Sequence, residues 1–144
     1  DGLEPSALAR RPPGKWSGAE IVEHLARSYH ATSVALRKAL DSGSPRGRPR
    51  ALGQRVACFV VLTLGHLPSG RQAPQVVLPA GAAPEVVVPE ARQRLLQLDG
   101  DLADAHDRFG LTADEWRRFH FVHTRHHCRQ LTGRVAGAPH EGRP

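Results

Sequence analysis

The sequence predicts an all-α protein, a four-helix bundle in which residues 1–144 form a single domain. Apolar residues recur at helical spacing in four segments, a capping box precedes two of them, and proline- or glycine-rich stretches separate them. The length is sufficient for one hydrophobic core. No apolar run approaches the roughly 18 residues that a membrane span requires, so the pattern argues against a membrane protein.

The first helix is predicted to open at Ser17. Residues 1–15 before it are rich in proline and are expected to form an irregular lead-in. Ser17 and Glu20 match a capping box, in which each side chain satisfies the backbone N–H of the other residue. The apolar stripe of this helix continues to Leu40, and residues 41–49 have the composition of a turn and linker.

The second helix is predicted from about Arg50 to Leu67, and the Pro-Ser-Gly sequence of residues 68–70 ends it. A long proline-rich connection, residues 68–89, joins it to the third helix. This stretch is not expected to be helical, because it contains Pro74, Pro79, Pro84 and Pro89. This connection either covers the bundle as a loop or forms a small hairpin from Gln75–Leu78 and Glu85–Val88.

The third helix is expected to begin at Pro89, where the missing N–H of proline is harmless, and to end at Gly110. A second capping box, Thr112 to Glu115, opens a fourth helix that runs to roughly Leu131. Residues 133–144 form a tail. Four amphipathic helices with one long connection favour a four-helix bundle.

The charge of the chain permits nucleic-acid binding, because the net charge is +6. The basic residues are scattered, however, and aromatic residues make up only 5%, which is too few for base-stacking platforms. Two cysteines, Cys58 and Cys128, cannot form a disulfide framework. The composition therefore argues against a nucleic-acid partner and favours a reducing, cytoplasmic location.

Histidines are the most unusual feature of the sequence, with four of them between residues 120 and 127. His123 and His127 are spaced i, i+4, so their imidazoles lie one turn apart on the same face of the fourth helix. Such a pair can hold a divalent metal when a third ligand arrives from another helix. Taken alone, the pair is a weak signal, because solvent-facing or capping histidines with this spacing are more common than metal ligands.

His24 is the candidate for the third ligand, because it borders the apolar stripe of the first helix and so faces the bundle interior. His120 shares the face of His123 and is the substitute if this triad is wrong. Glu20, at i−4 from His24, is a candidate acceptor for its second N–H unless the capping box uses it. Gln130 is placed to do the same for His127.

Two segments resemble motifs of the DinB-like superfamily of metalloenzymes. Residues 14–25, Gly-Lys-Trp-Ser-Gly-Ala-Glu-Ile-Val-Glu-His-Leu, resemble its first-helix motif. Residues 123–131, His-Thr-Arg-His-His-Cys-Arg-Gln-Leu, resemble its last-helix motif. Residues 111–123 are similar to one uncharacterised bacterial branch of that superfamily. The proline-rich connection departs from the family pattern.

The resemblance implies a four-helix bundle that holds a divalent metal on His24, His123 and His127. Zinc and nickel are the leading metals, and imidazole ligands also suit iron and copper. It further implies a small-molecule substrate, a thiol-dependent transferase or hydrolase activity with a low-molecular-weight thiol, and a homodimer. Glu20, Tyr29, His120 and Gln130 are then candidates for orienting or proton-transfer roles. The alternative function is a non-catalytic, metal-stabilised bundle that acts as a binding or stress-response module.

Overall fold

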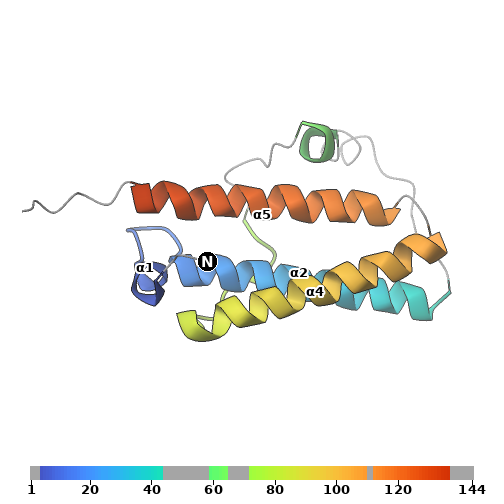
Figure 1. The fold of residues 1–144 in the computed structure, drawn as a ribbon, viewed down its shortest axis with the longest axis horizontal. Coiled ribbons are helices and arrows are strands. Elements are labelled where there is room, and N and C mark those ends of the chain that lie inside the picture. Colours follow the sequence, from blue (N-terminus) through green and yellow to red (C-terminus); the bar gives the residue numbers. More distant parts are fainter. Residues whose placement is uncertain (1–3, 44–58, 65–71, 110–111, 137–144) are drawn as a thin grey trace, which may run out of the picture.

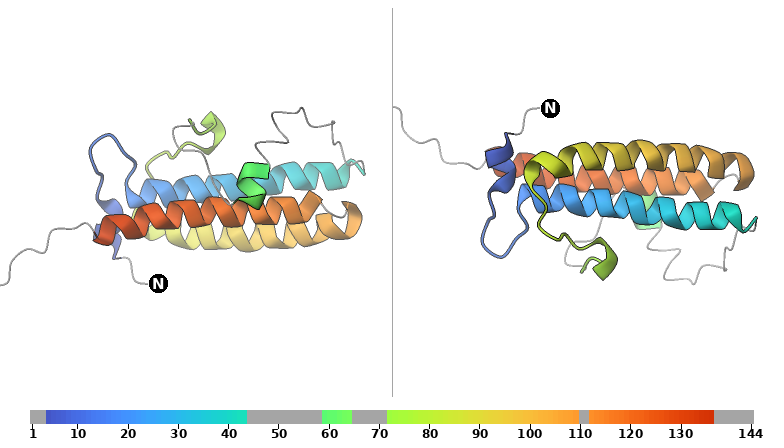
Figure 2. Two further views of the ribbon diagram at one scale, coloured as in Figure 1. Left: turned by 90° about the horizontal axis from the view of Figure 1, so that it is seen from above. Right: turned by 90° about the horizontal axis from the view of Figure 1, so that it is seen from below.

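The computed structural model describes residues 4–43, 59–64, 72–109 and 112–136, and every regular element in these ranges is helical. Three long helices, α2 (Gly18–Asp41), α4 (Pro84–Phe109) and α5 (Thr112–Ala136), lie side by side (Figures 1 and 2). Helices α2 and α4 run in the same direction, and α5 runs opposite to both (Figure 1). The predicted all-α class is therefore confirmed.

Helix α2 begins as the sequence predicts. The Ser17 hydroxyl accepts a hydrogen bond from the Glu20 backbone N–H at 3.2 Å, and the Glu20 carboxylate accepts one from the Ser17 N–H at 2.7 Å. The inner face of α2 is built on buried Ile21, Leu25 and Tyr29. These two hydrogen bonds fix the first turn of the helix that carries His24.

The lead-in predicted to be irregular contains a short helix, α1 (Pro5–Ala9). Pro5 occupies the first helical position, where its fixed φ angle suits the helix. Leu8 is buried in a small apolar cluster with Ala19 of α2 and Val87 of α4. Burial of this one leucine explains why the segment departs from the expected irregular structure.

The predicted hairpin within residues 75–88 is wrong. Residues Gln75–Val77 form one 3-10 turn, η2, and residues 85–88 lie inside α4. Helix α4 begins at Pro84, five residues before the predicted start, so Pro89 lies within the helix. Pro89 removes a single helical hydrogen bond near the start of α4, and the complete burial of Val87 favours the helix there.

The core between α2 and α4 is a cluster of buried residues contributed by both helices: Leu25, Tyr29, Leu40, Leu98, Leu102 and Ala105. Helix α5 begins at Thr112, as predicted, and extends to Ala136, which is five residues beyond the predicted end at Leu131. The predicted second helix, residues 50–67, falls largely outside the described residues. Its described part includes one π-helical turn, η1 (Phe59–Thr63), which contacts α5.

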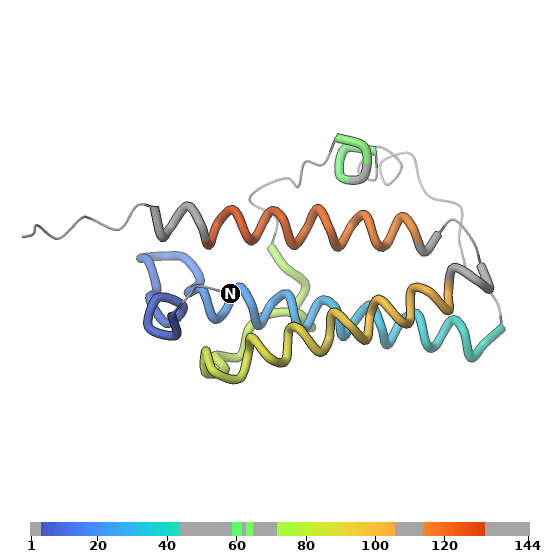
Figure 3. Tube along the Cα trace, in the orientation of Figure 1, coloured from blue at the N-terminus to red at the C-terminus, as the bar shows by residue number. Residues whose placement is uncertain are grey.

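The segment of residues 72–83 contains the 3-10 turn η2 and leads into α4. Figures 2 and 3 show this segment running beside α2 to the start of α4, and η2 within it contacts α2. Across the described ranges, none of the helices combines the length and apolar content that a membrane span requires.

Candidate metal centre

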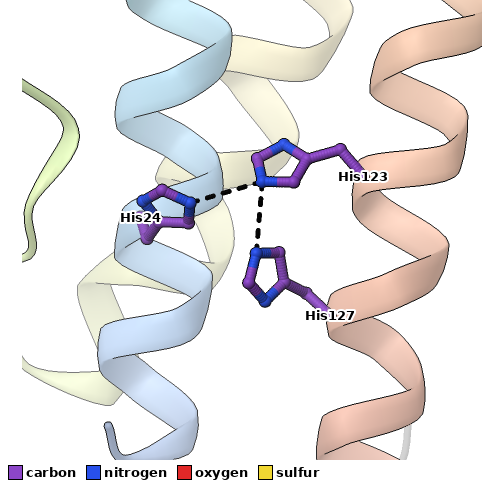
Figure 4. Close-up of side chains that lie close together, drawn as sticks. All are labelled: His24, His123 and His127. Carbon is purple, nitrogen blue, oxygen red and sulfur yellow. Dashed lines mark hydrogen bonds between the residues drawn. The ribbon is translucent and has the colours of Figure 1, made fainter. Parts of the chain in front are cut away.

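The three predicted metal ligands come together between α2 and α5. The Nε2 atom of His123 lies 3.3 Å from Nε2 of His24 and 3.1 Å from Nε2 of His127 (Figure 4). One ligand atom from each histidine lies within 4.8 Å of the other two, and all three side chains are buried. His24 stands in the second turn of α2, and the other two are one turn apart on α5.

Two of the three imidazoles are held by a second hydrogen bond. His24 donates from Nδ1 to the Val77 carbonyl at 2.9 Å, and His127 donates from Nδ1 to Oε1 of Gln130, also at 2.9 Å. Because a carbonyl oxygen only accepts, both imidazoles carry their proton on Nδ1 and present an Nε2 lone pair when neutral. This is the second interaction that metal-binding histidines usually make.

Glu20 does not play the predicted role of partner to His24. Its carboxylate is used by the Ser17 N–H of the capping box and by an ion pair with Arg11. The partner of His24 is instead a backbone carbonyl 53 residues away in the sequence. Gln130 does contact His127 as predicted, and its Nε2 also lies 3.0 Å from Nε2 of His126.

The three converging nitrogens fit a divalent cation. His24 and His127 direct lone pairs towards His123, whose single Nε2 can carry at most one proton for the two contacts. At least one of the two contacts therefore has no proton between its nitrogens, and a bound cation would remove this repulsion. Two imidazole nitrogens bound to one tetrahedral zinc ion at 2.0–2.1 Å lie about 3.3–3.4 Å apart, close to both observed separations.

Burial keeps two of the three histidines in the form that binds metal. Burial lowers the pKa of His24, an effect that the hydrogen bond to Val77 partly offsets. Burial and the neighbouring histidines lower the pKa of His123 to about 3. Within the described part of the chain, Nδ1 of His123 has no hydrogen-bond partner. Both imidazoles are therefore neutral near pH 7, as metal ligation requires.

Aromatic side chains lie against two of the ligands. The Trp16 ring lies 5.1 Å from the His24 ring, and the Phe119 ring stacks on His123 at 5.5 Å with an angle of 29° between the planes. Distances here join ring centroids. Apolar rings beside a metal site limit the access of water and lower the local dielectric constant.

His120 and Tyr29 are buried but hydrogen-bond elsewhere. The Thr32 hydroxyl donates to the Ser28 carbonyl, so it accepts from Nε2 of His120 at 3.0 Å. Burial lowers the pKa of His120 to about 4. The Tyr29 hydroxyl lies 2.6 Å from Oγ1 of Thr124, and burial raises the pKa of Tyr29. These hydrogen bonds of His120 and Tyr29 are made to threonines rather than to the triad.

A cavity of about 510 Å³ lies between α4 and α5. Its lining is mainly apolar, with Leu98, Leu102 and Phe121, and it includes His120 and Thr124. None of the three triad histidines lines it. The cavity is therefore separate from the triad, and His120 is the one histidine in its lining.

Sequence reasoning missed two residues that support the triad, Val77 and Glu23. Val77 supplies the carbonyl for His24, and Glu23 accepts hydrogen bonds from the backbone of the same segment, at Ala80, Gly81 and Ala82. The sequence offered only a weak signal for this contact. It has a glycine inside the proline-bounded stretch 79–84, and an adjacent Glu and His in the first helix. Nothing in helical spacing connects residues so distant in sequence.

Comparison with known proteins gives one family. A family model described as "Protein of unknown function (DUF1569)" matches residues 1–134. No curated protein and no solved structure matches the chain.

Proposed function

Since the chain belongs to the DUF1569 family, for which no function is defined, we propose a function from the site itself: the protein binds a divalent metal on His24, His123 and His127 and uses it in catalysis. The observation that carries this proposal is the convergence of three buried Nε2 atoms, with separations of 3.1 and 3.3 Å. Three neutral imidazoles are the ligand set of catalytic rather than structural zinc sites.

Zinc and nickel are the proposed metals, because imidazole suits both. When bound, such an ion lowers the pKa of a coordinated water or thiol and polarises an electrophile. The chain's own residues orient the ligands. Val77 and Gln130 fix the tautomers of His24 and His127, while Trp16 restricts water beside His24.

The proposed reaction is thiol transfer to, or hydrolysis of, a small molecule, with a low-molecular-weight thiol as co-substrate in the first case. This follows the resemblance to the DinB-like superfamily, which we propose as the wider relationship of the chain. The same proposal includes a fourth bundle helix from residues 50–67, a homodimer and a cytoplasmic location.

A non-catalytic, metal-stabilised bundle is the second candidate. It is favoured by one observation: three of the four residues considered for proton transfer have hydrogen-bond partners outside the triad. Glu20 pairs with Ser17 and Arg11, and the hydroxyl or imidazole groups of Tyr29 and His120 bond to threonines. Gln130 contacts the triad, but an amide is not a general acid or base.

Metal content tests the site directly. Elemental analysis of tag-free protein, incubated with zinc or nickel and desalted, is expected to give close to one metal per chain. His24→Ala and His123→Ala should abolish this, because each removes a ligand. His126→Ala is the matched control, since it removes a histidine of the same helix that lies outside the triad. Metal-free wild-type protein, or equal loss in all three variants, would refute the site.

Turnover separates the two candidate functions. The metal-loaded protein is assayed for transfer of a low-molecular-weight thiol to small electrophiles and for ester hydrolysis, beside the His123→Ala variant. Metal-dependent turnover that is lost in the variant supports the enzyme. Metal-dependent stability without turnover supports the binding module instead.

A further inference from the structure

The carboxylate of Glu23 is buried and holds the backbone of the segment that follows η2. Its Oε1 accepts a hydrogen bond from the Ala80 N–H at 2.9 Å, and its Oε2 accepts from Gly81 at 2.9 Å and Ala82 at 3.0 Å. Arg27, one turn along α2, adds an ion pair at 3.0 Å. Three consecutive N–H groups thus converge on one anion, the concave arrangement known as a nest.

The backbone of this segment is shaped for the contact. Gly81 has a φ of +88°, a conformation that side-chain-bearing residues rarely adopt, and it turns its N–H towards Glu23. Pro79 restricts the chain just before the nest. Three residues before Ala80, Val77 is buried and its carbonyl accepts the Nδ1–H of His24. Adjacent residues of α2, Glu23 and His24, therefore hold the two ends of one short segment.

Glu23 is connected to the proposed metal site through the backbone of residues 77–82. The position of the Val77 carbonyl depends on where residues 80–82 are held, and that carbonyl selects the Nδ1–H tautomer of His24. Only this tautomer leaves Nε2 of His24 free to face His123 and His127. Glu23 itself makes no hydrogen bond to the three histidines, so its influence passes through the backbone of the segment.

We propose that Glu23 is a positioning residue for the metal ligand His24, acting through residues 77–82. The inference rests on the proposed metal site. Loss of a group that orients a metal-bound histidine typically costs 10- to 100-fold in metal affinity, and we expect an effect of about this size. The coupling is reciprocal, so zinc should in turn protect the backbone N–H groups of residues 80–82 from hydrogen exchange.

The first variant is Glu23→Gln, which keeps the shape of the side chain and replaces one accepting oxygen with an NH2 group that faces backbone donors. Glu90→Gln is the matched control, because Glu90 makes an i, i+4 ion pair with Arg94 on α4. A second variant, Gly81→Ala, disturbs the nest from the segment's side. Its Cβ meets no atom within 4 Å, so only the positive φ is strained.

Two measurements are made on each variant well below its melting temperature. The zinc Kd is obtained by competition with a chromophoric chelator, and the protonation of the His24 ring nitrogens is read by 15N NMR of the metal-free protein. We expect the zinc Kd to rise at least 10-fold in Glu23→Gln and Gly81→Ala and by less than 2-fold in Glu90→Gln. We also expect His24 to lose its pure Nδ1–H form in the first two variants.

A zinc Kd within 2-fold of wild type together with an unchanged His24 tautomer in Glu23→Gln would overturn the proposal. If Glu23→Gln fails to fold, Gly81→Ala decides by the same two criteria. If the wild-type protein binds no zinc or nickel, the proposed function fails. The NMR measurement on the metal-free protein then still decides whether Glu23 positions His24, so the two failures are distinguishable.

Discussion

Acidification should destabilise the metal-free protein well above the pH at which its carboxylates titrate. Burial lowers the pKa of His120 to about 4, and burial with neighbouring histidines lowers that of His123 to about 3, from an ordinary value of 6.5. The unfolded chain therefore binds more protons than the folded chain below pH 6.5. Stability is fully present above that pH and falls as the pH drops towards the folded-state pKa values.

The size of the effect follows from these pKa values. Between pH 7 and pH 5, an unfolded histidine gains about 2 kcal/mol of protonation free energy, whereas a folded one with a pKa of 3 or 4 gains almost none. The two histidines, His120 and His123, should together lower the free energy of unfolding by about 4 kcal/mol between pH 7 and pH 5. This is a large part of the 5–15 kcal/mol that stabilises a typical domain.

Urea unfolding of the chelator-treated protein at pH 7 and pH 5 measures this loss. The His120→Gln variant should lose a large part of the pH dependence, because it removes one of the two histidines whose pKa is lowered to about 3 or 4. His126→Gln removes a histidine that is only partly buried and serves as the control. A midpoint in urea that is the same at both pH values, or a His120→Gln variant with the full pH dependence, would refute the reasoning.

Three further substitutions test the packing, each by the urea midpoint relative to wild type. Gly18→Ala places a Cβ 3.0 Å from Leu8 Cδ2 and 3.1 Å from Leu8 Cα, so it should displace α1. We expect it to lower the free energy of unfolding by about 1–3 kcal/mol and to speed proteolysis of residues 10–15. An unchanged cleavage rate would contradict this. Leu98→Ala empties a site that is 1% exposed and should cost about 2–5 kcal/mol; a loss below 1 kcal/mol would mean that the core between α2 and α4 is loose. Tyr29→Phe removes the 2.6 Å hydrogen bond to Thr124 and should cost about 1 kcal/mol, whereas a gain in stability would show that this bond is not formed.

The parts of the fold that were predictable depend on short-range patterns. The Ser17–Glu20 capping box and the i, i+4 pair His123 and His127 are each contained within one or two helical turns, and the described structure has both. His24 was also predictable, because its place beside an apolar stripe directs it inward. Such features follow from helix geometry alone.

The remainder depends on contacts between distant residues. Glu20 was a reasonable partner for His24 by helical spacing, yet the true partner is the Val77 carbonyl. The start of α4 at Pro84 likewise follows from burial of Val87 against α1 and α2, which the run of valines and prolines does not reveal. Local helix propensity carries no information about contacts that form only in the folded chain.

The triad joins a residue of α2 to two residues of α5 that lie far from it in sequence, and this distance affects folding during synthesis. His24 and His123 are separated by 99 residues, so an ion that joins them closes a loop nearly as long as the described chain. In the unfolded chain such a loop has an entropy cost similar to that of a disulfide, about 4.7 kcal/mol. During synthesis, α2 and α4 can pair before α5 has left the ribosome, but the ion has no complete site until residue 127 emerges. Binding of the proposed metal should therefore come late in synthesis, after α2 and α4 have paired.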